Sequence, residues 1–320
     1  MNTVTKIWLS VGAFLIVIGS IIFASVMHTL NWDLTKLSTT QYETNYHEIS
    51  EDFHAISIQS DTADIQFVLA ADAKCSVVCH EQQNAAHSVT IKDGSLVIEI
   101  IDSRKWHEYI GIHFGTPKIT VYLPKTEYTA LLIKESTGDI AVPEDFCFDR
   151  VDISLSTGDV RCLASASGLM KIATRTGSII AENISAGALD LSSSTGNITV
   201  TQADCAGDIA VTVTTGKVSL NNIQCQNMIS GGSTGDISMA NVFAGEMLSA
   251  VRTTGDVQFD HCEATDVLIK TDTGDVTGTL LSGKIFTVQS DTGEISVPES
   301  VSGGKCQITT DTGDIRIAID

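Results

Sequence analysis

The stretch DVLIKTDTGDV, residues 266–276, decides the fold of this chain. Apolar and polar residues alternate up to a Thr-Gly pair, and a second alternating run begins at the β-branched Val276. Strict alternation is typical of a half-buried β-strand, and a Thr-Gly pair between two such runs indicates a tight corner. The stretch therefore predicts two strands joined at Gly274.

The same pattern recurs along most of the chain. Thr-Gly occurs ten times at intervals of 19 or 20 residues, with its glycines at positions 138, 158, 177, 196, 216, 235, 255, 274, 293 and 313. The residue two after each glycine is Ile or Val, and the residue seven before it is apolar in every copy. The residue five before it is apolar in nine copies, and Ser230 is the exception. A unit of this length cannot bury its own apolar face, but stacked units share a continuous interior. The sequence thus predicts an all-β fold, a parallel β-solenoid of about ten coils, each 19–20 residues long and ~4.8 Å from the next.

The repeat also divides the ectodomain. Residues 135–320 form the regular array, and residues 52–134 are predicted to form a degenerate first coil and an N-terminal cap. Ala63 replaces glycine in the degenerate corner, residues 70–118 break the period, and Ser95–Ile100 is expected to be a strand within the cap. The last alternating run, Ile315–Ile319, is followed only by Asp320. We therefore expect it to leave an open strand edge, through which copies of the chain associate.

The N-terminal segment is predicted to cross a membrane. Residues 7–27 are 21 consecutive uncharged residues, and about 20 apolar residues span a bilayer as a helix. Lys6 precedes this segment, so the positive-inside rule places residues 1–6 in the cytosol and the C-terminal domain outside the cell. Residues 28–51 are polar, lack a clear period and are interpreted as a stalk. Cleavage near Ala24-Ser25-Val26, as in a signal peptide, is the alternative to a single-pass anchor.

The net charge excludes several partners. The chain has 39 acidic and 19 basic residues, a net charge of −20 and an isoelectric point near 4.6. Nucleic acids and anionic lipid headgroups both require clustered Lys and Arg, which are missing here. Cationic ligands fit the charge better.

Several motifs together resemble a known bacterial family. They are the run Ile119-Thr120-Val121-Tyr122-Leu123-Pro124, then Tyr128 and Leu131, then the repeated Thr-Gly-Asp-Ile/Val units. These residues resemble the β-strand-repeat family of unknown function that is often labelled "putative adhesin". The resemblance covers residues 52–320, and a single N-terminal span is common in that family. It implies an envelope protein in adhesion or envelope-stress sensing, and it carries no catalytic residues.

Acidic residues flank the corner most densely in the last three copies. Six carboxylates of these copies are expected to lie close together, and they are the candidate metal ligands: Asp272, Asp275, Asp291, Glu294, Asp311 and Asp314. Carboxylates at about 5 Å repel one another, which favours a bound cation such as Ca²⁺. The alternative is a solvated acidic edge that prevents aggregation. No other cofactor is expected, and a repeated Asp-Thr-Gly along one edge does not build the facing carboxylate pair of an aspartic protease.

The threonines of the Thr-Gly pairs and the cysteines allow further predictions. By strand parity the threonines point inward, where their hydroxyls satisfy the backbone of the corner, and an exposed threonine ladder, as in ice-binding solenoids, is the alternative. Cys205 and Cys225 each follow their glycine by nine residues in adjacent coils, so they are candidates for a disulfide. Cys75 and Cys79 would lie ~13 Å apart on one strand, too far for one shared metal, and His80 and His87 do not repair that geometry.

One aromatic loop is ambiguous. Trp106, His107, Tyr109, His113 and Phe114 form either an aromatic binding patch or the packing of the cap.

The sequence favours a non-enzymatic, membrane-anchored surface solenoid that acts in adhesion or envelope-stress sensing. Its acidic edge would meet a cationic peptide, another surface ligand or an envelope protein. Two alternatives remain: a β-helix polysaccharide lyase or hydrolase, and a self-assembling envelope scaffold.

Overall fold

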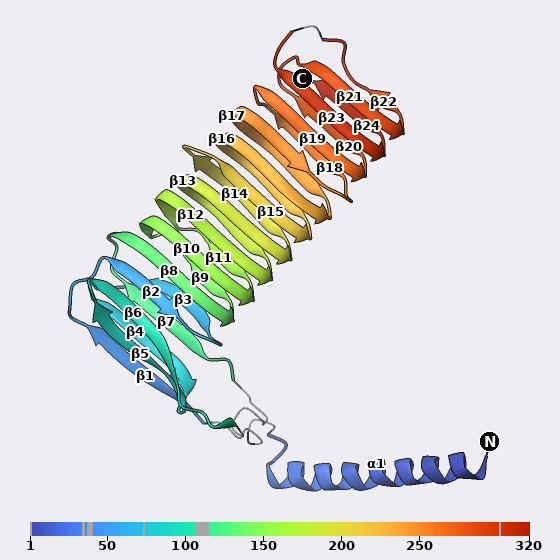
Figure 1. The fold of residues 1–320 in the computed structure, drawn as a ribbon. Coiled ribbons are helices and arrows are strands. Elements are labelled where there is room, and N and C mark those ends of the chain that lie inside the picture. Colours follow the sequence, from blue (N-terminus) through green and yellow to red (C-terminus); the bar gives the residue numbers. More distant parts are fainter. Residues whose placement is uncertain (1, 34–35, 37–40, 73, 107–114, 301) are drawn as a thin grey trace.

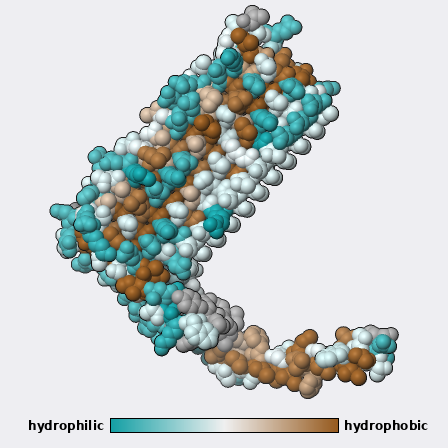
Figure 2. Space-filling view, viewed as in Figure 1, coloured by the Kyte–Doolittle hydropathy of each residue, from teal (hydrophilic) through white to brown (hydrophobic). Residues whose placement is uncertain are grey.

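The computed structural model describes residues 2–33, 36, 41–72, 74–106, 115–300 and 302–320 (Figure 1). It contains one N-terminal helix and a rod of stacked strands, so the predicted β-solenoid is confirmed. The helix, α1 (Thr3–Thr29), is long and apolar enough to cross a membrane, and it also suits a signal sequence. Its apolar side chains are almost all exposed and dominate its surface in Figure 2.

The rod has two main walls of parallel strands. The first wall contains the strands that precede the Thr-Gly corners and two strands of the N-terminal coils, β6 (Ser95–Asp102) and β2 (Ala55–Gln59). In spatial order these are β6, β2, β8 (Glu127–Thr137), β10 (Cys147–Thr157), β12 (Ser165–Thr176), β13 (Ile179–Thr195), β15 (Ile209–Thr215), β16 (Val218–Thr234), β17 (Ile237–Val251), β19 (Asp266–Thr273), β23 (Lys305–Thr312) and β21 (Ile285–Thr292).

The second wall contains the strands that follow the corners. Their spatial order is β7 (Lys118–Leu123), β3 (Asp64–Leu69), β9 (Ile140–Val142), β11 (Val160–Cys162), β13, β14 (Ile198–Cys205), β16, β17, β18 (Val257–Cys262), β20 (Val276–Leu280), β24 (Ile315–Ile319) and β22 (Ile295–Ser296). The strands β13, β16 and β17 belong to both walls, because each continues from the second wall of one coil into the first wall of the next.

The core lies between the walls and follows the predicted apolar columns. Ile153, Ile172 and Leu191, from consecutive coils, are all fully buried. Alternation places their neighbours on the solvent face, which is why each coil needs only a few apolar residues.

A further corner follows the second wall in the middle coils. The residue six after the glycine has a positive φ in five consecutive coils: Asn183, Gln202, Asn222, Asn241 and His261. Asn tolerates this left-handed conformation better than most residues do. The side-chain amide of Asn241 also donates a 2.9 Å hydrogen bond to Asn222 Oδ1, which links the corners of adjacent coils.

The N-terminal end departs from chain order. The degenerate coil β2–β3 lies between the coil of β8 and β9 and an outer coil of β6 and β7. Outside this, β4 (Cys75–Gln82) pairs antiparallel with β7, and β5 (Ala85–Lys92) pairs antiparallel with β6. These strands form the predicted cap, and the strand expected at Ser95–Ile100 is β6.

The predicted stalk is wrong for residues 42–49. These residues form β1 (Tyr42–Ile49), which pairs antiparallel with β4 over its whole length. It is an edge strand whose side chains are half-buried or exposed, so it lacks the apolar alternation that reveals the other strands. The boundary expected at residue 134 also falls within β8.

The prediction of an open edge at Ile315–Ile319 is wrong for its first two residues. At Ile315 and Arg316 this strand, β24, lies between β20 and β22, whereas residues 317–319 have a ladder partner only in β20. The outermost coil is that of β21 and β22. Pro298 follows soon after β22, which is only two residues long, and proline cannot donate a ladder hydrogen bond. The coil with the shortened strand is therefore the better one for the outer position, whereas β24 pairs with β20 along its whole length.

Candidate functional site

The Thr-Gly corners form a continuous exposed edge. Every glycine of the ten pairs has φ between 116° and 158°. At Gly177 a Cβ atom would lie 1.9 Å from the Gly158 carbonyl oxygen of the neighbouring coil. Only glycine fits this close approach.

The threonines of this edge are exposed in all ten coils, so the prediction that they point inward is wrong. Strand alternation ends three residues before the glycine. The strands continue to the threonine, but the ladder skips the residue before it, and the side chains of both residues lie at the surface. The inward hydroxyls belong instead to the residue three before the glycine. Ser193 Oγ donates to the Gly177 carbonyl at 3.0 Å, and Thr271 Oγ1 donates to the Gly255 carbonyl at 3.0 Å.

The acidic residues after the glycines form a hydrogen-bonded ladder. Asp139 Oδ1 accepts from the Asp159 amide at 2.8 Å, and Asp159 Oδ1 accepts from the Ser178 amide at 2.7 Å. Asn197 has the same role toward the Lys217 amide, at 2.9 Å. Each of these side chains thus connects two coils, so this column of carboxylates stabilises the stacking of the coils.

The six predicted metal ligands lie in adjacent coils, at the corners of β19, β23 and β21. Asp275 Oδ1 accepts from the Asp314 amide at 2.8 Å, and Asp314 Oδ1 accepts from the Glu294 amide at 2.8 Å. That second hydrogen bond lowers the pKa of Asp314 most, and Arg316 beside it lowers the pKa further.

The other carboxylates of this set also have partners. Asp272 lies 3.5 Å from Lys270 Nζ, and Asp291 Oδ1 accepts from Gln289 at 3.2 Å. Calcium binding at these residues therefore stays a prediction, in competition with the ladder.

Cys205 and Cys225 lie side by side. The residues before them, Asp204 and Gln224, are paired in adjacent coils. Both cysteines are free thiols in the structure, and burial raises the pKa of Cys225 to about 12. The disulfide between them stays a prediction. Of the predicted aromatic patch, Trp106 is exposed, whereas His107, Tyr109, His113 and Phe114 lie outside the described residues.

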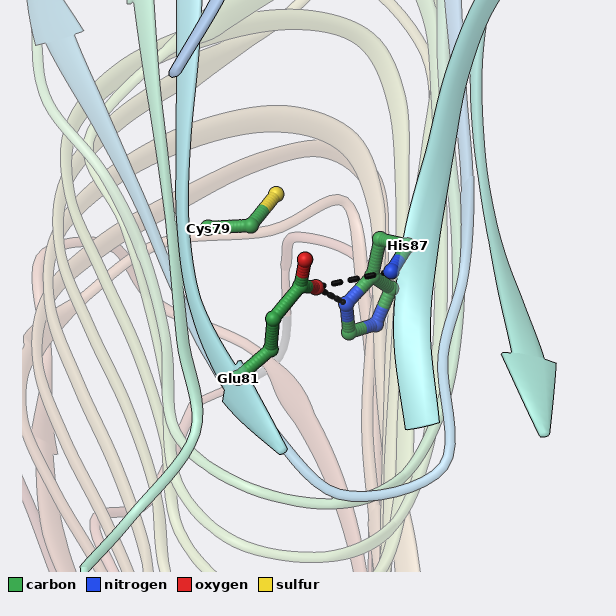
Figure 3. A group of neighbouring side chains, drawn as sticks. All are labelled: Cys79, Glu81 and His87. Carbon is green, nitrogen blue, oxygen red and sulfur yellow. Dashed lines mark hydrogen bonds and ion pairs between the residues drawn. The ribbon is translucent and has the colours of Figure 1, made fainter. Parts of the chain in front are cut away.

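A buried polar cluster lies at the N-terminal end of the rod and was not predicted. Cys79, Glu81 and His87 each bring one possible metal-ligand atom within 4.8 Å of the others. Their exposed fractions are 0%, 1% and 6%. Figure 3 shows the thiol and the carboxylate projecting from β4 toward the imidazole on β5.

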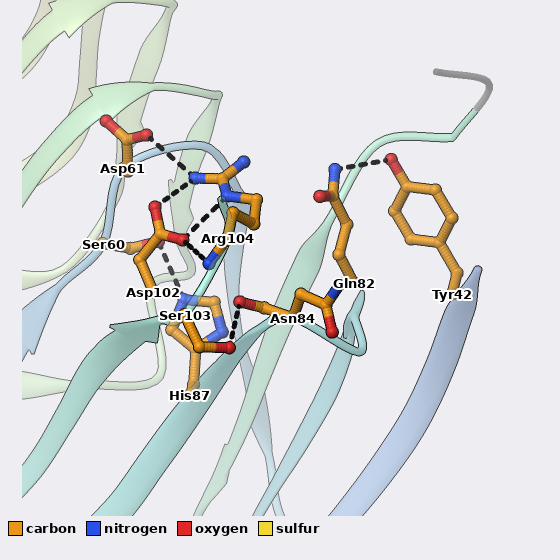
Figure 4. A network of polar contacts seen from close by, with 9 residues as sticks. All are labelled: Tyr42, Ser60, Asp61, Gln82, Asn84, His87, Asp102, Ser103 and Arg104. Atoms are coloured by element: carbon orange, nitrogen blue, oxygen red, sulfur yellow. Dashed lines mark hydrogen bonds and ion pairs between the residues drawn. The ribbon is translucent and has the colours of Figure 1, made fainter. Parts of the chain in front are cut away.

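Hydrogen bonds hold this cluster in place. Glu81 Oε2 accepts from the His87 amide at 2.7 Å and lies 2.6 Å from His87 Nδ1, while Glu81 Oε1 accepts from Asn45 at 2.7 Å. His87 Nε2 lies 2.9 Å from Ser60 Oγ. Figure 4 shows that Ser60 and His87 adjoin the Arg104–Asp102 ion pair at the rim of the cap.

The environment shifts the pKa values of this cluster in opposite directions. Burial alone would raise the pKa of Glu81, but hydrogen bonds from His87 and Asn45 outweigh it and hold that pKa below its usual value. Burial, and then the charge of Glu81, raise the pKa of Cys79 to about 12. The carboxylate is thus ionised at neutral pH while the thiol keeps its proton.

The order hydroxyl, imidazole, carboxylate is that of a serine hydrolase triad. Ser60 is only 7% exposed, however, and its hydroxyl faces the interior toward His87. A substrate carbonyl cannot reach an oxygen enclosed in this way, so the arrangement does not support acyl transfer.

Two signals in the sequence bear on this cluster. Cys75, Val77, Cys79 and Glu81 alternate on one face of β4, which places a carboxylate in an apolar column. The hairpin that returns the chain to His87 has no such signature, because β4 and β5 form only one ladder pair, Gln82 with Ala85, before they separate into different walls.

Two further buried charges occupy the column three before the glycine. Glu135 is 3% exposed, and burial raises its pKa to about 7. Arg252 is 1% exposed, and its Nη1 donates to the Val213 carbonyl at 2.6 Å across the space left by Gly232. Its Nε and Nη2 atoms have no hydrogen-bond partner within the described residues.

Comparison with solved structures finds several proteins at low sequence identity. A "putative adhesin" from Parabacteroides distasonis is 12% identical, with a TM-score of 0.49 over 76% of this chain and 98% of its own. A "putative lipid binding protein" from the same species is 18% identical, with a TM-score of 0.46 over 75% and 95%. A "putative adhesin" from Bacteroides fragilis is 15% identical, with a TM-score of 0.43 over 87% and 97%.

No curated protein matches the chain. The family model named Toastrack DUF4097 matches residues 53–213 and again residues 198–320, which together span the whole solenoid. These two matches overlap at residues 198–213, within the regular array, as expected for one repeated coil. The chain therefore belongs to the Toastrack DUF4097 family.

Proposed function

We propose that the chain is a non-enzymatic, membrane-anchored surface protein that acts in adhesion or envelope-stress sensing by binding cationic ligands along its Thr-Gly edge. The observation that carries this proposal is the charge of that edge. The two columns that flank the Thr-Gly and Thr-Ala corners, counted from Asp61 to Asp314, contain twelve carboxylates and two cationic residues, Arg175 and Lys217. All the threonines between them are exposed.

The negative potential is strongest at the coils farthest from α1. All six residues at the corners of β19, β23 and β21 in these columns are acidic, whereas the middle coils carry Ser, Thr or Asn at many of these positions. Lys270 and Arg316 neutralise only two of the six. A peptide with Lys or Arg at regular spacing would meet carboxylates in successive coils at ~4.8 Å intervals.

Binding of a fluorescent Lys/Arg-rich peptide to the full chain in nanodiscs of zwitterionic lipid tests this proposal. We expect the affinity to fall as the salt concentration rises, because the charges on the edge are exposed and therefore screened. The triple variant Asp272→Asn, Asp291→Asn, Asp311→Asn should bind more weakly. The matched control is Asp152→Asn, Asp190→Asn, Asp204→Asn, which removes the same charge from the walls. Equal losses in the two variants, or binding that is independent of salt, would overturn the proposal.

Self-assembly into a scaffold is the second candidate, and the open C-terminal end favours it. The strands β21 and β22 are outermost, and Ile295 in β22 is 46% exposed. A second copy could pair with this edge. Light scattering of the full chain in nanodiscs over a range of concentrations tests this candidate.

A further inference from the structure

We propose that Cys79, Glu81 and His87 bind one Zn²⁺ ion. Thiolate sulfur, imidazole nitrogen and carboxylate oxygen are the ligands that zinc takes in proteins, and sites with three protein ligands keep a fourth position for water. The three candidate atoms lie within 4.8 Å of one another, so a single ion between them reaches all three after small side-chain rotations.

The architecture brings these ligands together from two walls. Cys79 and Glu81 lie two residues apart on β4, which extends the second wall through its pairing with β7. His87 lies on β5, which extends the first wall through its pairing with β6. The three side chains meet in the space between the walls (Figure 3). An ion there would fasten the two walls where the solenoid ends and the cap begins.

The charges of the site balance around a divalent cation. Without a metal, the Glu81 carboxylate is a buried negative charge whose nearest partners are His87 and the amide of Asn45. A buried charge is costly unless it is compensated. Zn²⁺ with one thiolate, one carboxylate and one neutral imidazole has no net charge.

The protons also balance. Because a carboxylate only accepts, His87 Nδ1 carries the proton in the metal-free network and Ser60 donates to Nε2. When Nδ1 binds zinc, its proton is relocated to Nε2, and the Nε2–H group then donates a hydrogen bond to Ser60 Oγ. The Cys79 thiol loses its proton to solvent, so one proton is released for each ion bound.

Neighbouring residues already provide the supporting shell of a metal site. Ser60 Oγ is hydrogen-bonded to His87 Nε2, and the side-chain amide of Asn45 donates to Glu81 Oε1. Such contacts orient the ligands of metal sites.

The first test uses the unmodified full chain in detergent, reduced and stripped with a chelator. Addition of Co²⁺ should produce a thiolate-to-cobalt charge-transfer band, and Zn²⁺ should abolish it at one equivalent. X-ray absorption of the zinc form should show one sulfur neighbour at about 2.3 Å. If the chain retains no stoichiometric zinc after dialysis and gives no band, the cluster is a proton-holding network only and the proposal is overturned.

Variants then assign the site. Cys79→Ser should remove the band, whereas Cys147→Ser, which alters an exposed thiol, should keep it. Ser60→Ala should weaken zinc affinity by about 10- to 100-fold with the ligands intact, as loss of a supporting contact does. The control His261→Asn alters the exposed group of Asp260, His261 and Asp320, and should leave the cobalt spectrum unchanged. A band that survives in Cys79→Ser would place the metal elsewhere and refute the assignment.

Discussion

The two ends of the solenoid share an exchange in the order of their last two coils, but they differ in what covers the outermost coil. At each end the outermost coil is formed by residues farther from the terminus than those of the coil that lies inside it. At the N-terminal end antiparallel strands then close the interior, and Leu96 and Ile98 of the outer coil are fully buried. At the C-terminal end the equivalent residues Phe286 and Val288 are only half-buried. The strand exchange therefore does not by itself seal the core, and the antiparallel cap does.

The largest change in stability is expected at a regular Thr-Gly corner, and a much smaller one at the degenerate N-terminal corner. Gly177→Ala should lower the free energy of unfolding by about 4 kcal/mol, because a Cβ there would lie 1.9 Å from the Gly158 oxygen at a positive φ. Ala63 occupies the same column without a positive φ, so Ala63→Gly should cost only about 1 kcal/mol. Urea unfolding measures both. Similar losses of unfolding free energy in the two variants would mean that the two corners do not differ in their need for glycine.

Next in size is a pH effect at the N-terminal end. The pKa of Glu135 rises from 4.5 to about 7 in the folded chain, so the folded state holds this proton more tightly than the unfolded state. Stability from this group is complete below pH 4.5 and is lost as the pH rises toward 7, by about 3 kcal/mol in total. In urea titrations, Glu135→Gln should become more stable than the natural chain at pH 8 and lose that advantage near pH 4. The exposed Glu127→Gln on the same strand is the control, and parallel pH curves for all three proteins would contradict the assignment.

A third prediction concerns the interior of the middle coils. Arg252→Met should raise the free energy of unfolding by about 1 to 2 kcal/mol, because it removes a buried charge that has no ionic hydrogen-bond partner among the described residues. Lys284→Met is the contrast, since Lys284 is equally buried but pairs with Glu263, and its loss should destabilise the chain. Calorimetry of both variants distinguishes the two environments. A lower melting temperature for Arg252→Met would show that this side chain is needed.

The carboxylate ladder should respond more weakly. Asp159→Ala removes the acceptor for the Ser178 amide and should cost about 1 kcal/mol. Asp159→Asn should be nearly neutral, because Asn197 already plays this role toward Lys217. Equal losses for Ala and Asn in chemical unfolding would mean that charge, and not the hydrogen bond, is what matters at this position.

The smallest effect on stability is expected at the open end. Ile295→Lys alters a side chain that is 46% exposed, so it should change the free energy of unfolding by less than about 0.5 kcal/mol. If copies associate through β21 and β22, the same change should abolish the association in light scattering. The matched change at the capped end, Ile101→Lys at an exposed position of β6, should leave it intact. Association that survives Ile295→Lys would place the contact elsewhere.

The sequence predicts the array well because each coil repeats the same physical requirement. Ile or Val two residues after each glycine and the apolar residue seven before it determine the register, and the structure follows them throughout. The order of coils at the ends was not predictable, since β23 has the same pattern as β21 and either could pair with β19. The order of pairing between coils depends on the length of the strands and on the position of Pro298. Neither can be inferred from the periodic pattern.

The site was harder to predict for a different reason. Periodicity shows which residues of β4 face inward, Glu81 among them, but it does not show what lies opposite. His87 reaches Glu81 because β4 and β5 separate into different walls after a single pair. Parity does not predict the exposed threonines, because the alternation is interrupted at the residue before each threonine, which the ladder skips.

The outer position of the coil of residues 285–296 has a consequence for proteolysis. Within this coil β22 is only two residues long and pairs with β24 alone among the described strands, and Ile295 is 46% exposed. Few ladder hydrogen bonds have to break before this segment opens, and local opening is what exposes a backbone to a protease. We therefore expect the first cut by an endopeptidase to fall within this coil.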